Sequence, residues 1–105
     1  MIGLAGCGRM GKPMLASLRS MGLRAKGFDV VDRGSDWITT DPQRFSRDLS
    51  TLITVVRDID QTDDVLFNVQ GFVDSAPKLE RIIICSTLSP KYVRALRTRI
   101  PENIV

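Results

Sequence analysis

The chain has 105 residues, 43% hydrophobic and 26% charged, which is typical of one globular domain. Its net charge of +3 comes from interspersed basic and acidic residues, which argues against nucleic acid as a partner. There is no histidine, and the two cysteines, Cys7 and Cys85, lack metal-ligand spacing, so a histidine base is excluded and no metal site is expected. No apolar run approaches the roughly 20 residues of a membrane span, and no signal peptide is recognisable. We therefore expect a cytoplasmic protein with reduced cysteines and no membrane partner.

The chain begins with a strand pattern followed by a helix pattern. Residues 1–6, "MIGLAG", predict a buried strand that ends in glycine. Methionines and leucines then recur at helical spacing over residues 10–21 and predict a helix with one apolar stripe. Pro13 falls in its first turn, where a missing N–H costs little, and Gly22 is a natural stop.

The next segments predict a strand, a loop and a short helix. Residues 23–30 alternate in polarity and predict a second strand that ends near Asp29. Residues 31–43 are rich in turn formers and predict a loop. Residues 42–49 can form a short helix with Asp41 as its N-cap.

The second half of the chain repeats the alternation. The β-branched run at 51–56 predicts a third strand, and residues 58–69 predict a helix with its acids mainly in the first turns. Residues 81–87, "RIIICST", predict a fourth buried strand, and residues 89–100 predict a helix opened by serine and proline. Residues 101–105 resemble the approach to a further strand.

Alternating strands and helices are the pattern of an α/β fold with a doubly wound parallel sheet. We therefore predict a Rossmann-like domain over residues 1–105, truncated to four or five strands. Right-handed crossovers place the first strand in the middle of the sheet and the glycine turn at its carboxyl end.

Three glycines follow the first strand in the spacing G-x-G-x-x-G, which favours a dinucleotide site in this context. Gly6 permits the sharp turn, Gly8 lets a pyrophosphate approach the backbone, and Gly11 lets the helix pack close to the strand. Amides around Arg9 and Met10, together with the helix dipole, attract the phosphates. The alternatives are a glycine turn without a cofactor and a site for another phosphorylated ligand.

The choice between NAD and NADP depends on the residues after the second strand. Asp29 stands about the expected 20 residues beyond the glycines, where a carboxylate binds the adenosine ribose and repels a 2′-phosphate. The next residue is Val30 rather than arginine, which favours NAD. NADP stays open, because a shift of the loop could bring Arg33 toward a 2′-phosphate.

Two sequence blocks carry a more specific resemblance. In the first, Met10 and Gly11 are followed by Pro13 and Met14; the second is "CSTLSP" at 85–90, after the fourth strand. Both resemble the N-terminal NAD(P)-binding domain of the β-hydroxyacid dehydrogenases, which include 3-hydroxyisobutyrate, tartronate semialdehyde, L-threonate and 6-phosphogluconate dehydrogenases. A less specific match is "TVVRDIDQTDDVLF", which is similar to the family segment after the third strand.

The resemblance implies a role for each matching position. Cofactor binding is implied for the glycine turn, the end of the second strand and the loops after the third and fourth strands: Gly6, Gly8, Arg9, Met10, Gly11, Asp29, Val30, Val56, Arg57 and Thr87. Ser86 and Thr87 would also bind the substrate, a small 3-hydroxy acid that gives a hydride to the nicotinamide. The alternative for these two hydroxyls is capping of the following helix, for which Ser89 is the better candidate.

The chain departs from the family pattern in two respects. Ile84 stands where the family has an aspartate, and none of the four lysines has the sequence context of the family's catalytic lysine. The helical second domain that closes the family's active site is also absent from these 105 residues. We therefore expect dinucleotide binding without dehydrogenase activity of the chain alone. A catalytically inactive nucleotide-binding or sensing module is the alternative, and the open sheet edge favours pairing with a second copy.

Overall fold

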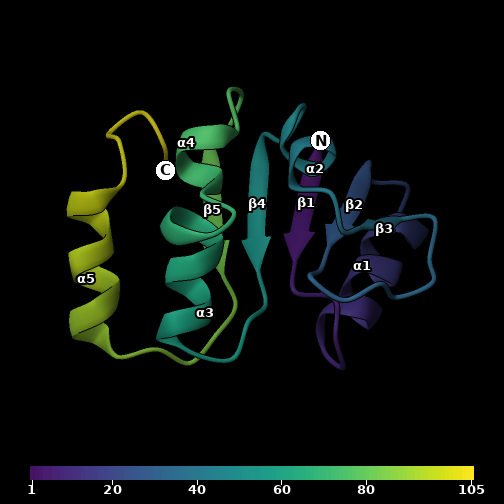
Figure 1. The fold of residues 1–105 in the computed structure, drawn as a ribbon, viewed down its shortest axis with the longest axis horizontal. Helices are drawn as coiled ribbons and strands as arrows, with labels where there is room; N and C mark the ends of the chain where they lie inside the picture. The colour runs from purple at the N-terminus through teal and green to yellow at the C-terminus, as the bar shows by residue number, and fades with distance from the viewer.

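The structure, a computed structural model, describes residues 1–105 and contains one parallel sheet of five strands in the order β3-β2-β1-β4-β5. The first strand is central, as the crossover rule predicts. Figure 1 shows β1 and β4 side by side and pointing the same way. The strands are β1 (Ile2–Ala5), β2 (Ala25–Phe28), β3 (Ile38–Thr39), β4 (Thr51–Thr54) and β5 (Arg81–Ile84).

Helices cover both faces of this sheet, so the predicted Rossmann-like α/β class is confirmed. In Figure 1 the first helix lies behind the sheet, the helices labelled α3 and α4 lie in front of it, and α5 lies at the left, beyond β5. No helix is long and apolar enough to cross a membrane. The helices are α1 (Gly11–Ser20), α2 (Pro42–Ser46), α3 (Ile59–Asp63), the π-helix η1 (Asp64–Asn68), α4 (Phe72–Ser75) and α5 (Pro90–Arg99).

The larger of two cores lies on the face covered by α2 to α5. Three rings, Phe28, Phe45 and Phe72, meet there with centroids 5.1 to 5.6 Å apart. Leu66 of η1 and Leu96 of α5 join the same cluster. Burial of these aromatic and aliphatic side chains is the main stabilising term for this layer.

The smaller core lies under α1, and its stripe is narrower than the sequence predicts. Leu15 is buried against β1 and β2, and Met14 and Leu18 are partly buried. Met10 and Met21, which the periodicity also assigns to the stripe, are 66% and 67% exposed. They lie beyond the two ends of α1, where the helical spacing no longer sets the direction of a side chain.

Two expectations about strands are wrong. The predicted loop at 31–43 contains β3, which pairs with β2 through hydrogen bonds such as Asp29 N to Thr39 O, 3.1 Å. The predicted fourth strand is β5, and it is not buried, since Ile83 is 41% exposed at the edge of the sheet. An apolar run of this length does not reveal whether both faces of its strand are covered.

The end of the chain lies against the β5 edge. The Val105 N–H donates to the Glu80 carbonyl, and the Val105 carbonyl accepts from the Ile82 N–H, both at 2.9 Å. This is the pairing expected of an approaching parallel strand, although residues 101–105 themselves form no strand.

The helical region after β4 is more broken than the sequence predicts. The expected single helix over 58–69 is α3 followed by η1, and α4 has no counterpart among the predicted elements. Asp58 caps α3 by accepting from the Gln61 N–H at 2.9 Å. η1 ends at Asn68, and Gly71, with φ of +59°, is the N-cap of α4, a left-handed conformation that glycine permits.

Candidate functional site

The glycine turn joins β1 to α1 with no room for side chains at two positions. Gly6 has φ of +98°, and a Cβ there would overlap the carbonyl oxygen of Val55. A Cβ on Gly11 would overlap the Gly6 carbonyl oxygen. The first turn of α1 is therefore pressed against the end of β1, which confirms the packing predicted for these two glycines.

Four consecutive amides at this turn have no acceptor in the protein. The N–H groups of Gly8, Arg9, Met10 and Gly11 donate to no backbone or side-chain oxygen, and the first helical amide that does is Lys12 N, to Gly8 O at 3.1 Å. Free amides at the start of a ten-residue helix are a ready site for an anion. A Cβ on Gly8 would meet only Arg33, 3.7 Å from its Nη2, so the space beside this glycine is open.

Asp29, just beyond β2, is tied to the turn. It is 8% exposed, and its Oδ2 accepts from the Cys7 N–H at 2.9 Å and from Arg33 Nε at 3.1 Å. Its Oδ1 accepts from the Val31 N–H at 3.1 Å. The carboxylate thus holds the turn, the loop after β2 and a guanidinium together.

The loops after β4 and β5 are braced against each other. Ser86 donates its hydroxyl proton to the Val56 carbonyl at 2.5 Å. The Arg57 N–H donates to the Gln61 side chain at 2.8 Å, which fixes the loop to α3. Ser86 therefore has its donor occupied, whereas Thr87 is exposed and makes no side-chain hydrogen bond in the protein.

These parts surround one hollow of about 910 Å³ at the carboxyl ends of the strands. Every residue predicted for cofactor or substrate binding lines it: Gly6, Gly8, Arg9, Met10, Gly11, Asp29, Val30, Val56, Arg57, Ser86 and Thr87. The structure thus brings together residues that are as much as 81 positions apart in the sequence, from Gly6 to Thr87. A hollow of this size lies in the range of ligand sites.

One wall of the hollow consists of residues that are not among the predicted site residues. It comes from α3, η1 and the turn after them, and it includes Gln61, Asp64, Val69 and Gln70. The Asp64 carbonyl accepts from both Val69 N and Gln70 N, at 2.9 and 3.0 Å, and this wide turn carries the chain round the rim. Single π-helical turns within α-helices, known as π-bulges, are frequent at functional sites. The signal for this wall was the segment "TVVRDIDQTDDVLF", which contains Gln61 and Asp64 and is similar to the family segment after the third strand.

The charges around the hollow favour an anionic ligand. Arg9, Arg33 and Arg57 line it together with the two acids Asp29 and Asp64. The carboxylate of Asp29 is already paired with Arg33, whereas the side chains of Arg9 and Arg57 make no ion pair. The free positive charge therefore lies beside the glycine turn and after β4.

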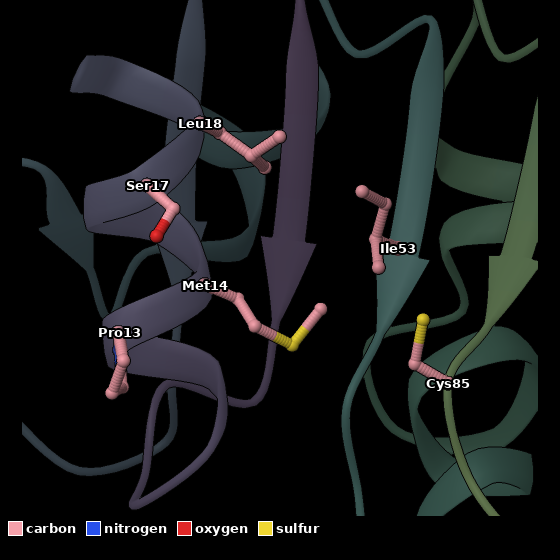
Figure 2. Close-up of a pocket in the computed structure, with 6 residues that line it drawn as sticks. All are labelled: Pro13, Met14, Ser17, Leu18, Ile53 and Cys85. Carbon is pink, nitrogen blue, oxygen red and sulfur yellow. The ribbon is translucent and has the colours of Figure 1, made fainter. Parts of the chain in front are cut away.

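A second hollow, of about 370 Å³, lies on the α1 face of the sheet and has different chemistry. Figure 2 shows Met14 and Leu18 of α1 on one side and Ile53 and Cys85 on the other. Ser17 is its only hydroxyl-bearing residue, and no charged side chain lines it. It lacks the groups that would orient a polar ligand, so the larger hollow is the candidate site.

The fold and the site together define a dinucleotide-binding domain of the Rossmann class, since a glycine turn with free amides lies at the carboxyl end of a central parallel strand. Over residues 1–105 the sequence matches the family model described as the NAD binding domain of 6-phosphogluconate dehydrogenase. The chain belongs to this family, and its ligand class is the nicotinamide dinucleotides.

Solved structures show the same fold at low sequence identity. A Mycobacterium tuberculosis 3-hydroxyisobutyrate dehydrogenase, solved with L-serine, is 21% identical over 93% of this chain, with a TM-score of 0.79. An imine reductase from Myxococcus stipitatus, in complex with NADP+, is 15% identical over 94%, with a TM-score of 0.80. The chain spans about a third of these proteins, 35% and 36% of their lengths. A comparison with curated proteins finds no match.

The two cysteines should differ sharply in reactivity. Cys7 is fully buried, and burial together with the nearby Asp29 carboxylate raises the pKa of its thiol to about 11. At pH 8 only about one Cys7 in a thousand is then a thiolate, the reactive form. Cys85 is half-buried and lines both hollows. A chromogenic disulfide reagent should therefore modify one thiol per native chain at pH 8 and two after unfolding.

The Cys85→Ser variant identifies the thiol that reacts. It should abolish the reaction of the native chain and leave one thiol that reacts only in denaturant. Modification of Cys7 in the folded variant at pH 8 would contradict the burial described above.

Proposed function

We propose that the 910 Å³ hollow holds the dinucleotide with its pyrophosphate on the amides of Gly8, Arg9, Met10 and Gly11. The observation that carries this proposal is the set of four donors without acceptors at the start of α1. Beside them the strand order reverses: the chain runs from β1 to β2 and β3 on one side of β1, and then crosses from β3 to β4 on the other side. Such a switch point is where ligands bind in open α/β sheets.

The two halves of the cofactor then lie on opposite sides of the turn. On the adenosine side, Asp29 reaches the ribose and Val30, 71% exposed, offers apolar surface to the base. On the nicotinamide side, Val56 and Arg57 line the path after β4, and Thr87 lies after β5. The Arg57 guanidinium, free of ion pairs, supplies positive charge near the pyrophosphate.

We propose that the substrate of the complete enzyme is a small 3-hydroxy acid. The Mycobacterium tuberculosis relative solved with L-serine, a molecule with a carboxylate and a hydroxyl on carbon 3, supports this class. The Thr87 hydroxyl is free to donate a hydrogen bond to the carboxylate. The Ser86 hydroxyl donates to the Val56 carbonyl, so toward the substrate it can only accept a hydrogen bond. Bound nicotinamide supplies the hydride acceptor.

Proton transfer in this reaction needs a general base. The chain has no histidine, and no lysine lines the hollow. Lys26, the one lysine with an ion pair, contacts Asp48. That contact lowers the pKa of the Asp48 carboxyl through the hydrogen bond from Lys26. We propose that these 105 residues bind the cofactor and position it, and that the proton acceptor comes from elsewhere in the enzyme. A nucleotide-binding module without catalysis shares these features.

The free thiols also indicate the cellular compartment of the protein. Cys7 and Cys85 are both unbridged, as is usual in a reducing compartment, and we propose the cytoplasm.

Binding is tested by calorimetric titration of the chain with NADH. We expect saturable binding for the natural chain and none for Gly8→Val, because the valine would occupy the space left for the pyrophosphate. The fold should survive, since a Cβ on Gly8 meets no backbone atom. Gly11→Ala is the contrasting variant: its Cβ overlaps the Gly6 carbonyl, so it should lose stability as well as binding. No binding of NADH or NADPH at millimolar concentration would remove the proposal.

Turnover distinguishes a cofactor-binding part from a complete catalyst. With NAD and 3-hydroxyisobutyrate, we expect no NADH formation above the blank at 340 nm, because no lysine or histidine lines the hollow. If NADH forms at a rate that Gly8→Val abolishes, another group of this chain takes the proton. The proposal that the proton acceptor comes from elsewhere in the enzyme would then be wrong.

Pairing with a second copy through the β5 edge remains a prediction. Val105 covers this edge only as far as Ile82, and the exposed Ile83 lies next to the uncovered part. Unpaired strand edges favour association, so light scattering should give the mass of a dimer. A strictly monomeric mass at high concentration would contradict the prediction.

A further inference from the structure

Exposed valines from two separate segments line the 910 Å³ hollow. Val30 and Val31, in the loop after β2, are 71% and 53% exposed, and Val69, in the turn after η1, is 68% exposed. Apolar side chains that line a ligand site provide contact surface for the flat, apolar part of the ligand. In a dinucleotide that part is a base, so these valines indicate a slot for one.

The aromatic core indicates that this slot belongs to the adenosine half of the site. Phe28 is the last residue of β2, and its ring centroid lies 5.4 Å from that of Phe72, the first residue of α4. Val69 and Gln70 come shortly before α4, so the turn after η1 lies close to the end of β2, although η1 follows β4 in the chain. The end of β2 also carries Asp29, the residue proposed for the adenosine ribose.

Asp64 is the one carboxylate in the hollow that has no partner within the protein. The two acids that line the hollow are Asp29 and Asp64. Asp29 accepts from the Cys7 N–H and is paired with Arg33. The side chain of Asp64 is half-buried and makes neither a hydrogen bond nor an ion pair. A free carboxylate beside a ligand with two phosphates is unfavourable unless a donor of the ligand meets it, so a donor is expected at Asp64.

A nicotinamide dinucleotide has three kinds of donor for a carboxylate: ribose hydroxyls, the 6-amino group of adenine and the carboxamide of nicotinamide. The adenosine ribose belongs beside Asp29, and the nicotinamide belongs beside Val56 and Thr87. The Asp64 carbonyl accepts from the Val69 N–H at 2.9 Å, so Asp64 lies on the wall that carries this exposed valine. The base is therefore the part of the ligand nearest to Asp64, and its donor is the 6-amino group.

We propose that the Asp64 carboxylate accepts a hydrogen bond from the 6-amino group of adenine and makes the site selective for adenine over a base with an oxygen at position 6. This inference rests on the proposed function, since it assumes that the dinucleotide lies in the hollow. Gln61, on the same wall, supports the base as a second polar group. Its Oε1 accepts from the Arg57 N–H at 2.8 Å, which leaves its amide N–H groups to donate to a ring nitrogen.

Hypoxanthine is the base that reveals this contact, because a carbonyl oxygen replaces the amino group of adenine. An acceptor would then face the Asp64 carboxylate, and neither oxygen could donate to the other. A site built for a donor rejects an analogue that lacks it, because the polar group of the protein is left unpaired. The loss of one hydrogen bond to a charged group lowers affinity by about ten-fold or more.

The test is calorimetric titration of the full chain with NADH and with reduced nicotinamide hypoxanthine dinucleotide. The natural chain should bind NADH about ten-fold more tightly or better. Asp64→Asn should reduce this preference to less than about three-fold, because an amide can accept from an amino group or donate to a carbonyl oxygen. The variant should fold, since it keeps the shape of a side chain that has no partner in the protein. Asp60→Asn is the matched control and should keep the preference, because Asp60 is an exposed aspartate one turn earlier, outside the hollow.

Three outcomes count against the inference, and they are distinguishable. Equal affinity of the natural chain for the two dinucleotides would overturn it and leave the proposed function intact, because cofactor binding itself would be established. A preference for NADH that persists unchanged in Asp64→Asn would also overturn it, since another group would then recognise the base. Binding of neither dinucleotide to the natural chain would remove the proposed function, and the inference with it.

Discussion

The contact between Gly11 and the Gly6 carbonyl is the constraint on which the site depends. It brings the first turn of α1 against the end of β1, so closely that neither position tolerates a Cβ. Because the helix starts there, its first amides lie beside the strand end instead of beyond it, and they are left without acceptors. A close backbone approach and a phosphate site are therefore two consequences of one packing arrangement.

Asp29 extends this constraint to the neighbouring strand. Its bond to the Cys7 N–H joins the end of β2 to the glycine turn, and its bonds to Val31 and Arg33 fold the next loop over the same place. The acid therefore has a structural task before any ligand arrives. Asp29, which the sequence predicts as a ribose-binding residue, is therefore also the residue that orders the loop after β2 and Arg33.

Much of the fold and the site was predictable because both follow from local patterns. The glycine spacing, the acid after the second strand and the polar residues after β4 and β5 all mark carboxyl ends of parallel strands, and such ends meet at one edge. The residues predicted from Gly6 to Thr87 line one hollow for this reason. The two-residue strand β3 was missed, because "WITT" is too short to show a period and is held by its bonds to β2.

The remaining features depend on contacts that no local pattern encodes. The sequence of β5 predicts a buried strand, yet β5 is the last strand of the sheet and Ile83 on it is exposed. The break from α3 to η1 arises from the Asp64 carbonyl accepting two amides. The sequence indicates only that Arg33 lies in a loop that could approach the cofactor. Its ion pair with Asp29, which holds it near Gly8, has no local signature. An acid at the end of β2 therefore does not by itself decide between NAD and NADP, because its carboxylate can already be paired within the protein.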